Sequence, residues 1–577
     1  MHPAKPTANS TSVLSRPLSR AGLIALVFVV AAAPAVLFFD PVELSPMRKG
    51  HISRDPRATY RLYSDDVAYV AASRTWDRAV ANLFVPHNTH VVPVWRLITW
   101  GLVAAAGRFE TLPEVLSIAS YGVLAAVMLA MGALAARETG SASIGLAAMA
   151  AVGTTSLLYA PATWYSAGQP LWAGLGVLSA LLYAQTYRRT GGTPALFLSS
   201  AAAVAAGWCW TIGHLAGPVA AVYLALDGRK RCRVAALVPF LASVLAATTG
   251  LVLARGAIDS TISFHGRTVR QAFDPFRGLS HTAQAIPENL VMGNLGLSVQ
   301  TTPVQGFVLT LGLLLLWVMR PGSPRFGPKA EHPPRLSFEP LECAGLALIA
   351  GAYLVEWSFR GYLEYRFLRT LNMRFIVPWY DAIPQIGLIL IVVGWLPRRS
   401  GRGLPRRVAR PTRRQALVVL ALTLALVILN KPRVDAHLRA SFPSLSPSEL
   451  ELMPTERLQT MRASALLGEE ADWQRAYLVR LDMAEAAARR VGAGRDEIRA
   501  AIGHPWVPGS VGILSPRLYD LYDSLALLDI PQKGRAVPAD VIREALGPLL
   551  EQTPAPRPGW IGPDEPWPPP IPEQPAR

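Results

Sequence analysis

Charged residues and cysteines are scarce in this chain of 577 residues. Asp, Glu, Lys and Arg make up 16% of it, against roughly 25% in soluble domains. Together with a hydrophobic share of 51% and a mean hydropathy of +0.28, this scarcity excludes a mainly disordered protein and argues against a series of ordinary soluble domains. Cys209, Cys232 and Cys343 match neither a zinc-ligand spacing nor a disulfide framework. Phosphate-binding glycine-rich motifs are also missing, so no nucleotide site is indicated.

Acidic residues are outnumbered, with 39 Asp and Glu against 56 Lys and Arg, which gives a formal net charge of +17. A pI near 10.1 raises the question of nucleic-acid binding. That function requires the cations to gather on one folded face. Their positions along the chain therefore decide between nucleic acid and another explanation.

Long apolar segments are abundant. A bilayer core about 30 Å thick needs roughly 20 apolar residues in a helix. The first segment is too long for the core of a typical signal peptide, and no clear cleavage site follows it, which favours a retained span. The sequence offers eleven candidate spans: residues 21–39, 115–136, 144–161, 164–187, 195–210, 214–226, 234–254, 304–319, 341–359, 375–396 and 416–430.

Two apolar segments need separate interpretation. Residues 195–226 would form one helix of roughly 48 Å, too long for a single span, and Gly213 favours a break after Trp210. Residues 91–107 carry Arg96 and two tryptophans. This composition indicates an amphipathic helix lying on the outer surface of the membrane.

The positive charge separates by side when the N-terminus is placed in the cytoplasm. The loops then inside contain 22 Lys and Arg and four acids, a net charge of +18. Cytoplasmic loops are rich in Lys and Arg, so this arrangement explains the basic chain without nucleic acid. It predicts a multi-pass membrane protein with a cytoplasmic N-terminus and an outside C-terminus. The inside loops are residues 1–20, 137–143, 188–193, 227–233, 320–340 and 397–414, the last with eight arginines that would contact anionic lipid.

The expected fold class is an all-α polytopic membrane protein with about 11 transmembrane helices. After the last span, a capping-box motif at Ser446 precedes apolar helical periodicity, which predicts a small helical module on the outer side. The chain then divides into a cytoplasmic tail (1–20), a transmembrane domain (21–431) with a large first outer loop (40–114), the outer-side module (432–552) and a Pro-rich tail (553–577) expected to be disordered.

The first outer loop carries the residues best suited to catalysis. Asp65 and Asp66 precede a helix-forming stretch, and His87, Asn88 and His90 precede the amphipathic helix. A carboxylate close to a membrane-bound substrate can deprotonate an acceptor hydroxyl or amine, while its neighbour orients the acceptor. The structural alternative is that Asp65 caps a helix and Asp66 is solvated in its first turn. The acids and histidines could also ligate a divalent metal, although hydrogen bonding to donor or acceptor suits the histidines better.

This order of elements resembles the GT-C superfamily of membrane glycosyltransferases that use polyprenyl-phosphate sugars. Protein O-mannosyltransferases, aminoarabinose transferases and bacterial proteins that glycosylate the lipopolysaccharide core belong to it. The matching parts are a first span (21–39), the Asp65-Asp66 pair, a surface helix (93–107) and a second span (115–136), with PHNTHVVPVWRL at residues 86–97. The resemblance implies a GT-C-like fold in which Asp65 or Asp66 is the general base and His87, Asn88 and His90 bind donor or acceptor.

A second match lies at the entry to a late span. Arg374, Phe375 and Pro378 fit the Arg-Tyr/Phe-x-x-Pro pattern that members of the superfamily often carry there. The resemblance implies that Arg374, with Arg366 or Arg369, holds the lipid phosphate as a leaving group. The alternative is that these arginines extend toward lipid headgroups.

Other polar residues at predicted outer ends are less specific. Glu356 lies near the outer end of its span and is a functional candidate by default, although an ion pair with Arg360 is a simpler explanation. Five residues of the second outer loop (255–303) could line a substrate groove, namely His265, Arg267, Arg270, His281 and Glu288.

The leading hypothesis, which follows the resemblance, is a membrane glycosyltransferase that moves a sugar from a polyprenyl-phosphate carrier to a glycan, lipid or protein acceptor at the outer face of the bacterial inner membrane. The partners are then the lipid-linked donor, the acceptor and membrane lipids, with no nucleic acid and no cofactor other than an optional divalent metal. A non-catalytic transporter or envelope-assembly scaffold is the rival from another class. The absence of an internal repeat and the scarcity of charges within spans disfavour it. A glycan polymerase or ligase is a third reading.

Overall fold

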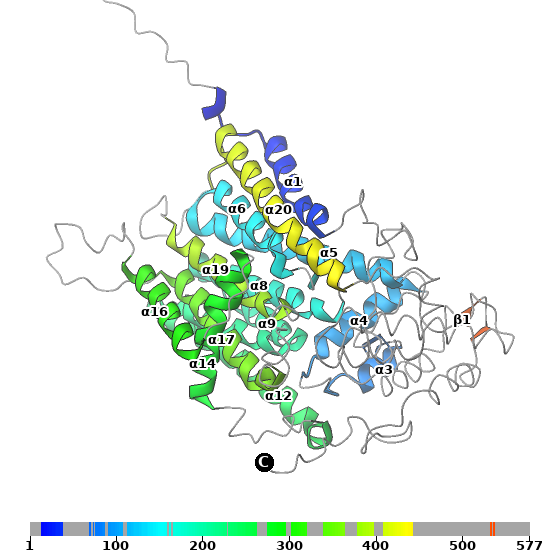
Figure 1. Cartoon of the computed structure of the whole chain (residues 1–577). Helices are drawn as coiled ribbons and strands as arrows, with labels where there is room; N and C mark the ends of the chain where they lie inside the picture. Colours follow the sequence, from blue (N-terminus) through cyan, green and yellow to red (C-terminus); the bar gives the residue numbers. More distant parts are fainter. Residues whose placement is uncertain are drawn as a thin grey trace, which may run out of the picture.

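The described part of the chain is almost entirely helical (Figure 1). A computed structural model describes residues 13–38, 69–70, 73, 75–86, 90–107, 112–158, 161–162, 165–227, 229–261, 274–295, 302–319, 339–363, 378–396, 408–441, 531–532 and 535–536. The strands in these ranges are β1 (Pro531–Gln532) and β2 (Arg535–Ala536), which form one antiparallel pair.

The longer apolar helices follow the hydropathy of the sequence. They are α1 (Arg20–Phe38), α5 (Leu112–Thr139), α6 (Ala142–Gly153), α8 (Gln169–Thr190), α9 (Thr193–Cys209), α10 (Ala216–Ala225), α12 (Leu237–Thr261), α16 (Pro303–Met319), α17 (Pro340–Leu363), α19 (Ala382–Trp395) and α20 (Arg413–Ser441).

Shorter elements connect them. They are α3 (Trp76–Ala81), α4 (Pro93–Ala106), α11 (Lys230–Ala235), α14 (Pro275–Ala285), α15 (Gly293–Leu295), the π-helix η7 (Ile286–Met292), and the 3-10 turns η1 (Val13–Ser15), η4 (Ser156–Leu158), η5 (Ser166–Gly168), η6 (Thr211–Leu215) and η11 (Pro378–Asp381).

A helix lies within each of the eleven ranges expected to span the membrane. Among the described residues, five helices are long and apolar enough to cross a bilayer, namely Arg20–Phe38, Val115–Thr139, Lys230–Ala254, Pro340–Ser358 and Arg413–Val434. The count of eleven spans stays a prediction because other apolar helices are shorter. Two ranges are only partly helical, since α6 ends at Gly153 and α19 begins at Ala382 after the η11 turn.

Both ambiguous segments have the expected secondary structure, while the position of residues 91–107 on the membrane surface stays a prediction. Residues 195–226 break at Trp210, whose extended backbone (φ −161°, ψ 140°) separates α9 from η6 and α10. Residues 91–107 form α4, which begins at Pro93 and ends at Gly107. Gly107 has φ 63°, a left-handed conformation that closes helices and favours glycine.

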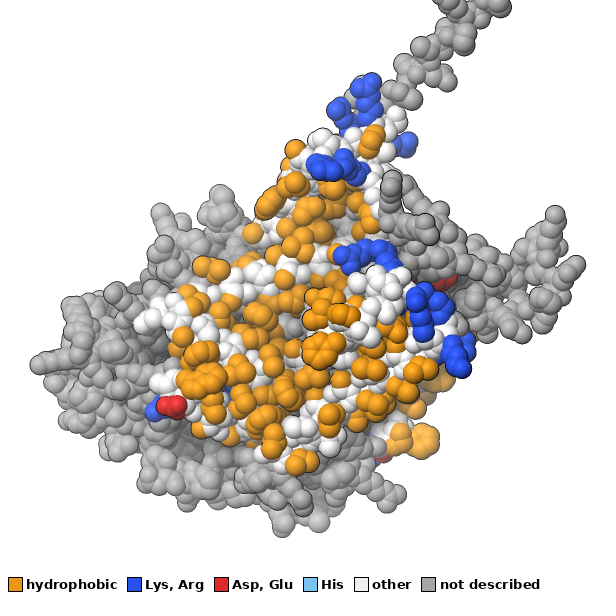
Figure 2. All heavy atoms as spheres, turned by 180° about the vertical axis from the view of Figure 1, so that it is seen from behind, with side chains coloured by type: hydrophobic (Ala, Val, Ile, Leu, Met, Phe, Trp, Pro, Cys, Tyr) orange, Lys and Arg blue, Asp and Glu red, His pale blue; other side chains and the backbone are white. Residues whose placement is uncertain are grey.

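Large apolar side chains cover the outside of the bundle. Figure 2 shows them spread over one face, with Lys and Arg gathered near its edges. Water solvates such an apolar surface poorly, whereas lipid chains solvate it well. These features are those of a polytopic α-helical membrane protein. Exposed examples are Phe28 on α1, Leu245 and Val252 on α12, Val304 and Leu316 on α16, and Leu424 and Ile428 on α20.

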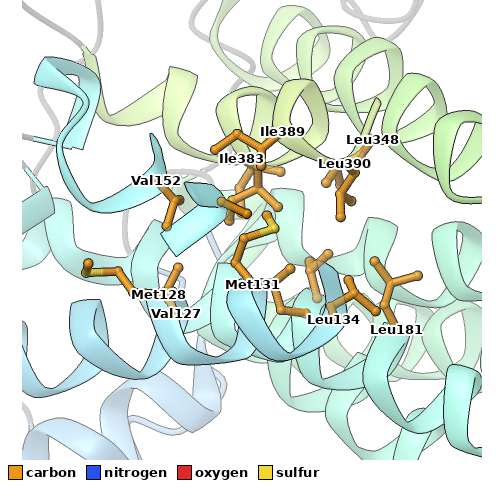
Figure 3. Packing of buried hydrophobic residues seen from close by; sticks show 14 of the residues in the cluster. Val127, Met128, Met131, Leu134, Val152, Leu181, Leu348, Ile383, Ile389 and Leu390 are labelled. Atoms are coloured by element: carbon orange, nitrogen blue, oxygen red, sulfur yellow. The ribbon is translucent and has the colours of Figure 1, made fainter. Parts of the chain in front are cut away.

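Figure 3 shows the part of the buried core that lies around α19. Ile383, Ile389 and Leu390 of α19 are at most 6% exposed and face side chains from four other helices. Because lipid is as apolar as these side chains, tight packing rather than exclusion of water holds such helices together. The facing residues are Val127, Met128, Met131 and Leu134 of α5, Val152 of α6, Leu181 of α8 and Leu348 of α17.

Glycines allow two pairs of helices to approach closely. A Cβ added at Gly345 of α17 would lie 2.5 Å from the carbonyl oxygen of Gly387 of α19, and one added at Gly387 would lie 2.8 Å from that of Gly345. Gly132 of α5 and Gly145 of α6 form a similar reciprocal contact. At these distances a methyl group would push the backbones apart.

The segments predicted to be inside converge at one end of the bundle. Arg188, at the end of α8, forms ion pairs with Glu138 of α5 at 3.8 Å and with Asp227 after α10 at 2.6 Å. Burial lowers the pKa of Arg188, but the nearby Tyr223 and the two carboxylates raise it by more. The cluster is therefore an ionised clamp between three helix ends.

The N-terminal segment and the arginine-rich loop meet at this same end. The Leu18 N–H donates to the Pro411 carbonyl oxygen at 2.9 Å, and the Ala409 N–H donates to that of Gly140 at 2.9 Å. These contacts set α1 and α20 side by side (Figure 1). The grouping of the inside loops agrees with the charge argument, while their side of the membrane stays a prediction.

Replacing Gly345 with Ala should destabilise the protein by about 1–3 kcal/mol, because the added methyl group overpacks the α17–α19 contact. Gly312→Ala on α16 is the matched control, since a Cβ there meets nothing within 4 Å. It should be neutral or stabilising by up to about 1 kcal/mol, the gain in helix propensity. The measurement is the free energy of unfolding in mixed micelles, and equal effects of the two changes would refute the close contact.

A reporter fused after Asn430 tests the orientation. Alkaline phosphatase needs disulfides and folds only in an oxidising compartment, so this fusion should be active. The control is the same reporter fused within residues 397–414, which should be inactive. The opposite pair of activities would invert the predicted topology.

Candidate functional site

Most residues expected to act in catalysis lie outside the described residues. These are Asp65, Asp66, His87, Asn88, Arg366, Arg369 and Arg374. The helical module expected at 432–552 lies outside them too, apart from residues 432–441, which belong to α20, and the β1–β2 pair. Their roles, the metal alternative and the function of that module stay predictions. His90 is described, and it links the first outer loop to the bundle.

His90 is held between the first outer loop and the η6 turn. Its Nδ1 lies 2.7 Å from the hydroxyl oxygen of Thr211, and its side chain is buried. Phe84, in the same loop, packs edge-on against Trp208 of α9 at 6.2 Å between ring centroids. The loop before α4 is therefore fixed over the end of α9, where the predicted topology places the outer face.

The buried face of α4 carries an aromatic cluster. Trp95 stacks on Tyr165 with ring centroids 4.5 Å apart and meets Tyr69 edge-on at 6.1 Å. The hydroxyl groups of Thr99 and Tyr165 lie 2.6 Å apart. These contacts make α4 a rigid platform at the start of the second span.

Arg96 belongs to the buried face of α4, where sequence reasoning had only placed it on a surface helix. The side chain is 3% exposed. Its NH2 group donates to the Val85 carbonyl oxygen at 2.9 Å, and the guanidinium carbon lies 5.6 Å from the centroid of the Tyr69 ring. Burial lowers the pKa of Arg96, partly offset by Tyr69. The sequence signal that could have indicated this buried position is that Arg96 lies three residues after Pro93, in the first turn of the helix and shortly after His90.

A second polar cluster lies at the predicted outer end of α17. The Tyr353 hydroxyl group donates to the Asp381 carboxylate at 2.8 Å. Glu356, one turn further along, lies 3.8 Å from Nε2 of His281 on α14. Glu356 was expected to pair with Arg360. The structure gives it a second neighbour, because His281 contacts it from another helix. Ionisable groups inside apolar bundles are costly and commonly functional.

An aromatic contact connects the two clusters. Trp210, next to Thr211, lies 5.6 Å from the ring centroid of Tyr380, which adjoins Asp381. The first outer loop, the η6 turn and the η11 turn thus form one continuous region. Sequence reasoning missed Asp381 and Tyr353 because their pairing joins residues 28 positions apart on different helices.

Asn294 braces the same end of the molecule. Its side-chain amide donates to Gln385 of α19 at 2.7 Å, and the Thr155 hydroxyl group donates to its carbonyl oxygen at 3.2 Å. Arg433 of α20 donates to its backbone carbonyl oxygen at 2.8 Å. A single residue therefore ties the segment after α6 to α19 and α20, close to η11 and Asp381.

Comparison with known proteins does not assign a family. No protein-family model matches the sequence, and no curated protein matches it significantly. Two solved chains of oligosaccharyltransferases from Archaeoglobus fulgidus are similar in structure. An apo form has 14% identity and a TM-score of 0.35, covering 77% of this chain and 58% of that one. The archaeal enzyme AglB, in complex with an inhibitory peptide and a dolichol-phosphate, has 14% identity and a TM-score of 0.38, covering 89% and 65%.

The chain thus spans about three fifths of the length of those two structures. A TM-score below 0.5 does not establish a common fold. This likeness therefore assigns neither a family nor an activity, and the function has to be argued from the residues.

Removing the Tyr353 hydroxyl group tests the second cluster. Tyr353→Phe should lower the free energy of unfolding by about 1–3 kcal/mol, because the buried Asp381 carboxylate loses a donor. Tyr183→Phe, at an exposed position of α8, is the control and should change it little. Equal stability of both variants in denaturation experiments would contradict the Tyr353–Asp381 bond.

Proposed function

We propose that this protein is a GT-C-type membrane glycosyltransferase. It transfers a sugar from a polyprenyl-phosphate carrier to a glycan, lipid or protein acceptor at the outer face of the bacterial inner membrane. One observation carries the proposal. The segment between α1 and α5 contains the Asp65-Asp66 pair and then folds as α4, a helix packed on α5. This is the order of elements that the sequence shares with the superfamily.

The reaction is a single displacement at the anomeric carbon. Asp65 or Asp66 takes the proton of the acceptor hydroxyl or amine group as the acceptor forms a bond to the anomeric carbon. The bond between that carbon and the phosphate oxygen breaks, and polyprenyl phosphate leaves with both electrons. Arg374, with Arg366 or Arg369, stabilises the leaving phosphate. The configuration of the sugar inverts.

The loop before α4 supplies groups that bind the sugar or the acceptor. His87, Asn88 and His90 are the candidates. Because Nδ1 of His90 is 2.7 Å from the Thr211 hydroxyl oxygen, the ring has a fixed orientation before substrate arrives. A fixed donor or acceptor loses less entropy on binding than a mobile one. The fixed ring of His90 therefore supports its role in binding the sugar or the acceptor.

The positions of buried charges favour an enzyme over a transporter. Transporters place ionisable groups near the middle of the membrane, where substrate passes. Among the described residues, Glu138, Arg188, Glu342 and Glu356 lie close to the ends of their helices. A non-catalytic scaffold, or a glycan polymerase or ligase with similar loops, remains the alternative that the transfer assay addresses.

Substitution of the acidic pair tests the proposal. The purified chain in nanodiscs, given a mixture of polyprenyl-phosphate sugars and candidate acceptors, should transfer sugar. Either Asp65→Asn or Asp66→Asn should slow transfer by about 100-fold or more, the contribution of a general base. Asp77→Asn is the matched control, because Asp77 is an exposed acid in the same loop.

The outcomes separate three readings. Loss of transfer in one Asp variant with an unaffected Asp77 variant supports the proposed base. Unchanged transfer in both Asp variants refutes the base but keeps the enzyme. An absence of transfer with every donor, while the protein stays folded, favours the non-catalytic alternative.

A further inference from the structure

Two adjacent residues of α4 bury hydrogen-bond donors that have no acceptor in the described part of the chain. Trp95 is 0% exposed and Arg96 is 3% exposed. The indole Nε1 of Trp95 and the Nε of Arg96 both lack a hydrogen-bond partner among the described residues. An indole N–H and a guanidinium N–H can only donate. Buried donors without acceptors are uncommon in native proteins, and a buried cation without a counter-ion is costlier still.

The two donors belong to one local site. Tyr69 contacts both side chains, since its ring lies edge-on to Trp95 at 6.1 Å and beneath the Arg96 guanidinium at 5.6 Å. Side chains of a helix tilt toward its N-terminus, so Arg96 lies over the first turn of α4. Its hydrogen bond to the Val85 carbonyl oxygen, in the loop before that turn, agrees with this direction.

The first turn of α4 adds further positive potential. The N–H groups at the start of a helix have no intrahelical acceptor, and the helix dipole favours an anion there. α4 has 14 residues and begins at Pro93. Within the described residues, its first N–H group with a hydrogen bond is that of Arg96, which donates to the Val92 carbonyl oxygen. The site therefore combines a buried cation, a buried indole donor and a helix N-terminus.

A buried arginine with a structural role lies at the predicted inner end of the bundle and can be compared with Arg96. Arg188 has two carboxylates, Glu138 and Asp227, within 4 Å. Arg96 has no carboxylate within ion-pair distance in the described ranges, and its neighbours there are the neutral Val85 carbonyl oxygen and Tyr69 ring. The contrast indicates that the missing anion of Arg96 comes with a ligand.

We propose that Arg96 and Trp95 bind an oxyanion at the N-terminal turn of α4, and that this oxyanion is the phosphate group of the lipid-linked donor. Phosphate offers several acceptor oxygens and a negative charge, which match a guanidinium and an indole donor together. A lipid phosphate lies at the depth of a surface helix. The assignment rests on the proposed function, because that function supplies the lipid-linked donor.

Binding of polyprenyl monophosphate tests the site without requiring transfer. The full chain is placed in nanodiscs of neutral lipid, and binding is measured for polyprenyl monophosphate, for the uncharged polyprenol and for inorganic phosphate. Arg96→Met keeps most of the side-chain length but removes the charge and the donors. It should weaken binding of polyprenyl monophosphate about tenfold or more, the loss of at least one charge-assisted hydrogen bond. Binding of polyprenol should not change.

Two further variants sharpen the result. Arg96→Lys keeps the charge and loses the Nε donor and the forked geometry, so its affinity should lie between those of wild type and Arg96→Met. Arg277→Met is the matched control, because Arg277 is an arginine of α14 whose side chain is 62% exposed. It should bind all three probes like wild type.

Thermal stability distinguishes a ligand-binding arginine from a structural one. Without ligand, Arg96→Met should be at least as stable as wild type, because it removes an unpaired buried charge. Polyprenyl monophosphate should then raise the melting temperature of wild type more than that of Arg96→Met. This result supports the site whether or not the protein transfers sugar.

Three outcomes would overturn the proposal. A ligand-free Arg96→Met variant that is much less stable than wild type, with a strong non-additive coupling to Asp65→Asn or Asp66→Asn, would show that a carboxylate of the chain is the partner. Binding of inorganic phosphate without binding of the lipid would assign the site to a free anion. Equal losses of affinity for polyprenyl monophosphate and polyprenol would show that Arg96 only shapes the lipid groove.

Discussion

The close approach of helix backbones at glycine is the constraint on which the rest of the structure depends. Lipid gives apolar helices little reason to associate, so they are held by tight packing where small residues let them approach. The Gly345–Gly387 contact brings α19 against α17 with less room than one methyl group. The same pairing sets the η11 turn beside α17, which places Asp381 within hydrogen-bonding distance of Tyr353. A polar contact at one end of the bundle therefore depends on an apolar contact near its middle.

The two ends of the bundle use arginine in opposite ways. At the predicted inner end, Arg188 is enclosed by Glu138 and Asp227, and the mutual attraction offsets the cost of burying all three charges. At the predicted outer end, Arg96 is equally buried but rests on an aromatic ring and a backbone carbonyl oxygen. The first arrangement joins helix ends and pairs the arginine with carboxylates of the chain. The second leaves positive potential at the surface helix. The burial alone does not distinguish these roles, whereas the identity of the neighbours does.

Hydropathy and charge predicted the positions of the helices because both act locally. The break at Trp210, the helix that begins at Pro93 and the convergence of the inside loops all follow from short-range composition and from the distribution of arginine. Helix ends were less predictable, since α6 stops at Gly153 and α19 starts only at Ala382 although apolar residues continue beyond both. Contacts such as Tyr353–Asp381 and Asn294–Gln385 join distant parts of the chain, so no local pattern could indicate them. Of the candidate site, only the placement of His90 can be compared with the sequence, and Asp65, Asp66 and Arg374 stay predictions.

The proposed chemistry would benefit from the rigidity of the predicted outer end. Departure of a phosphate concentrates negative charge on its oxygens, and donors lower that barrier most when they are already oriented before the reaction begins. The Val85 carbonyl oxygen and the Tyr69 ring hold Arg96, and the stacking on Tyr165 holds Trp95, without any substrate. Holding a cation in this way costs stability, because its counter-ion is absent until the ligand arrives. The rest of the fold must supply that stability, and the glycine contacts and the Arg188 cluster lie away from α4, where they can do so without restricting access to it.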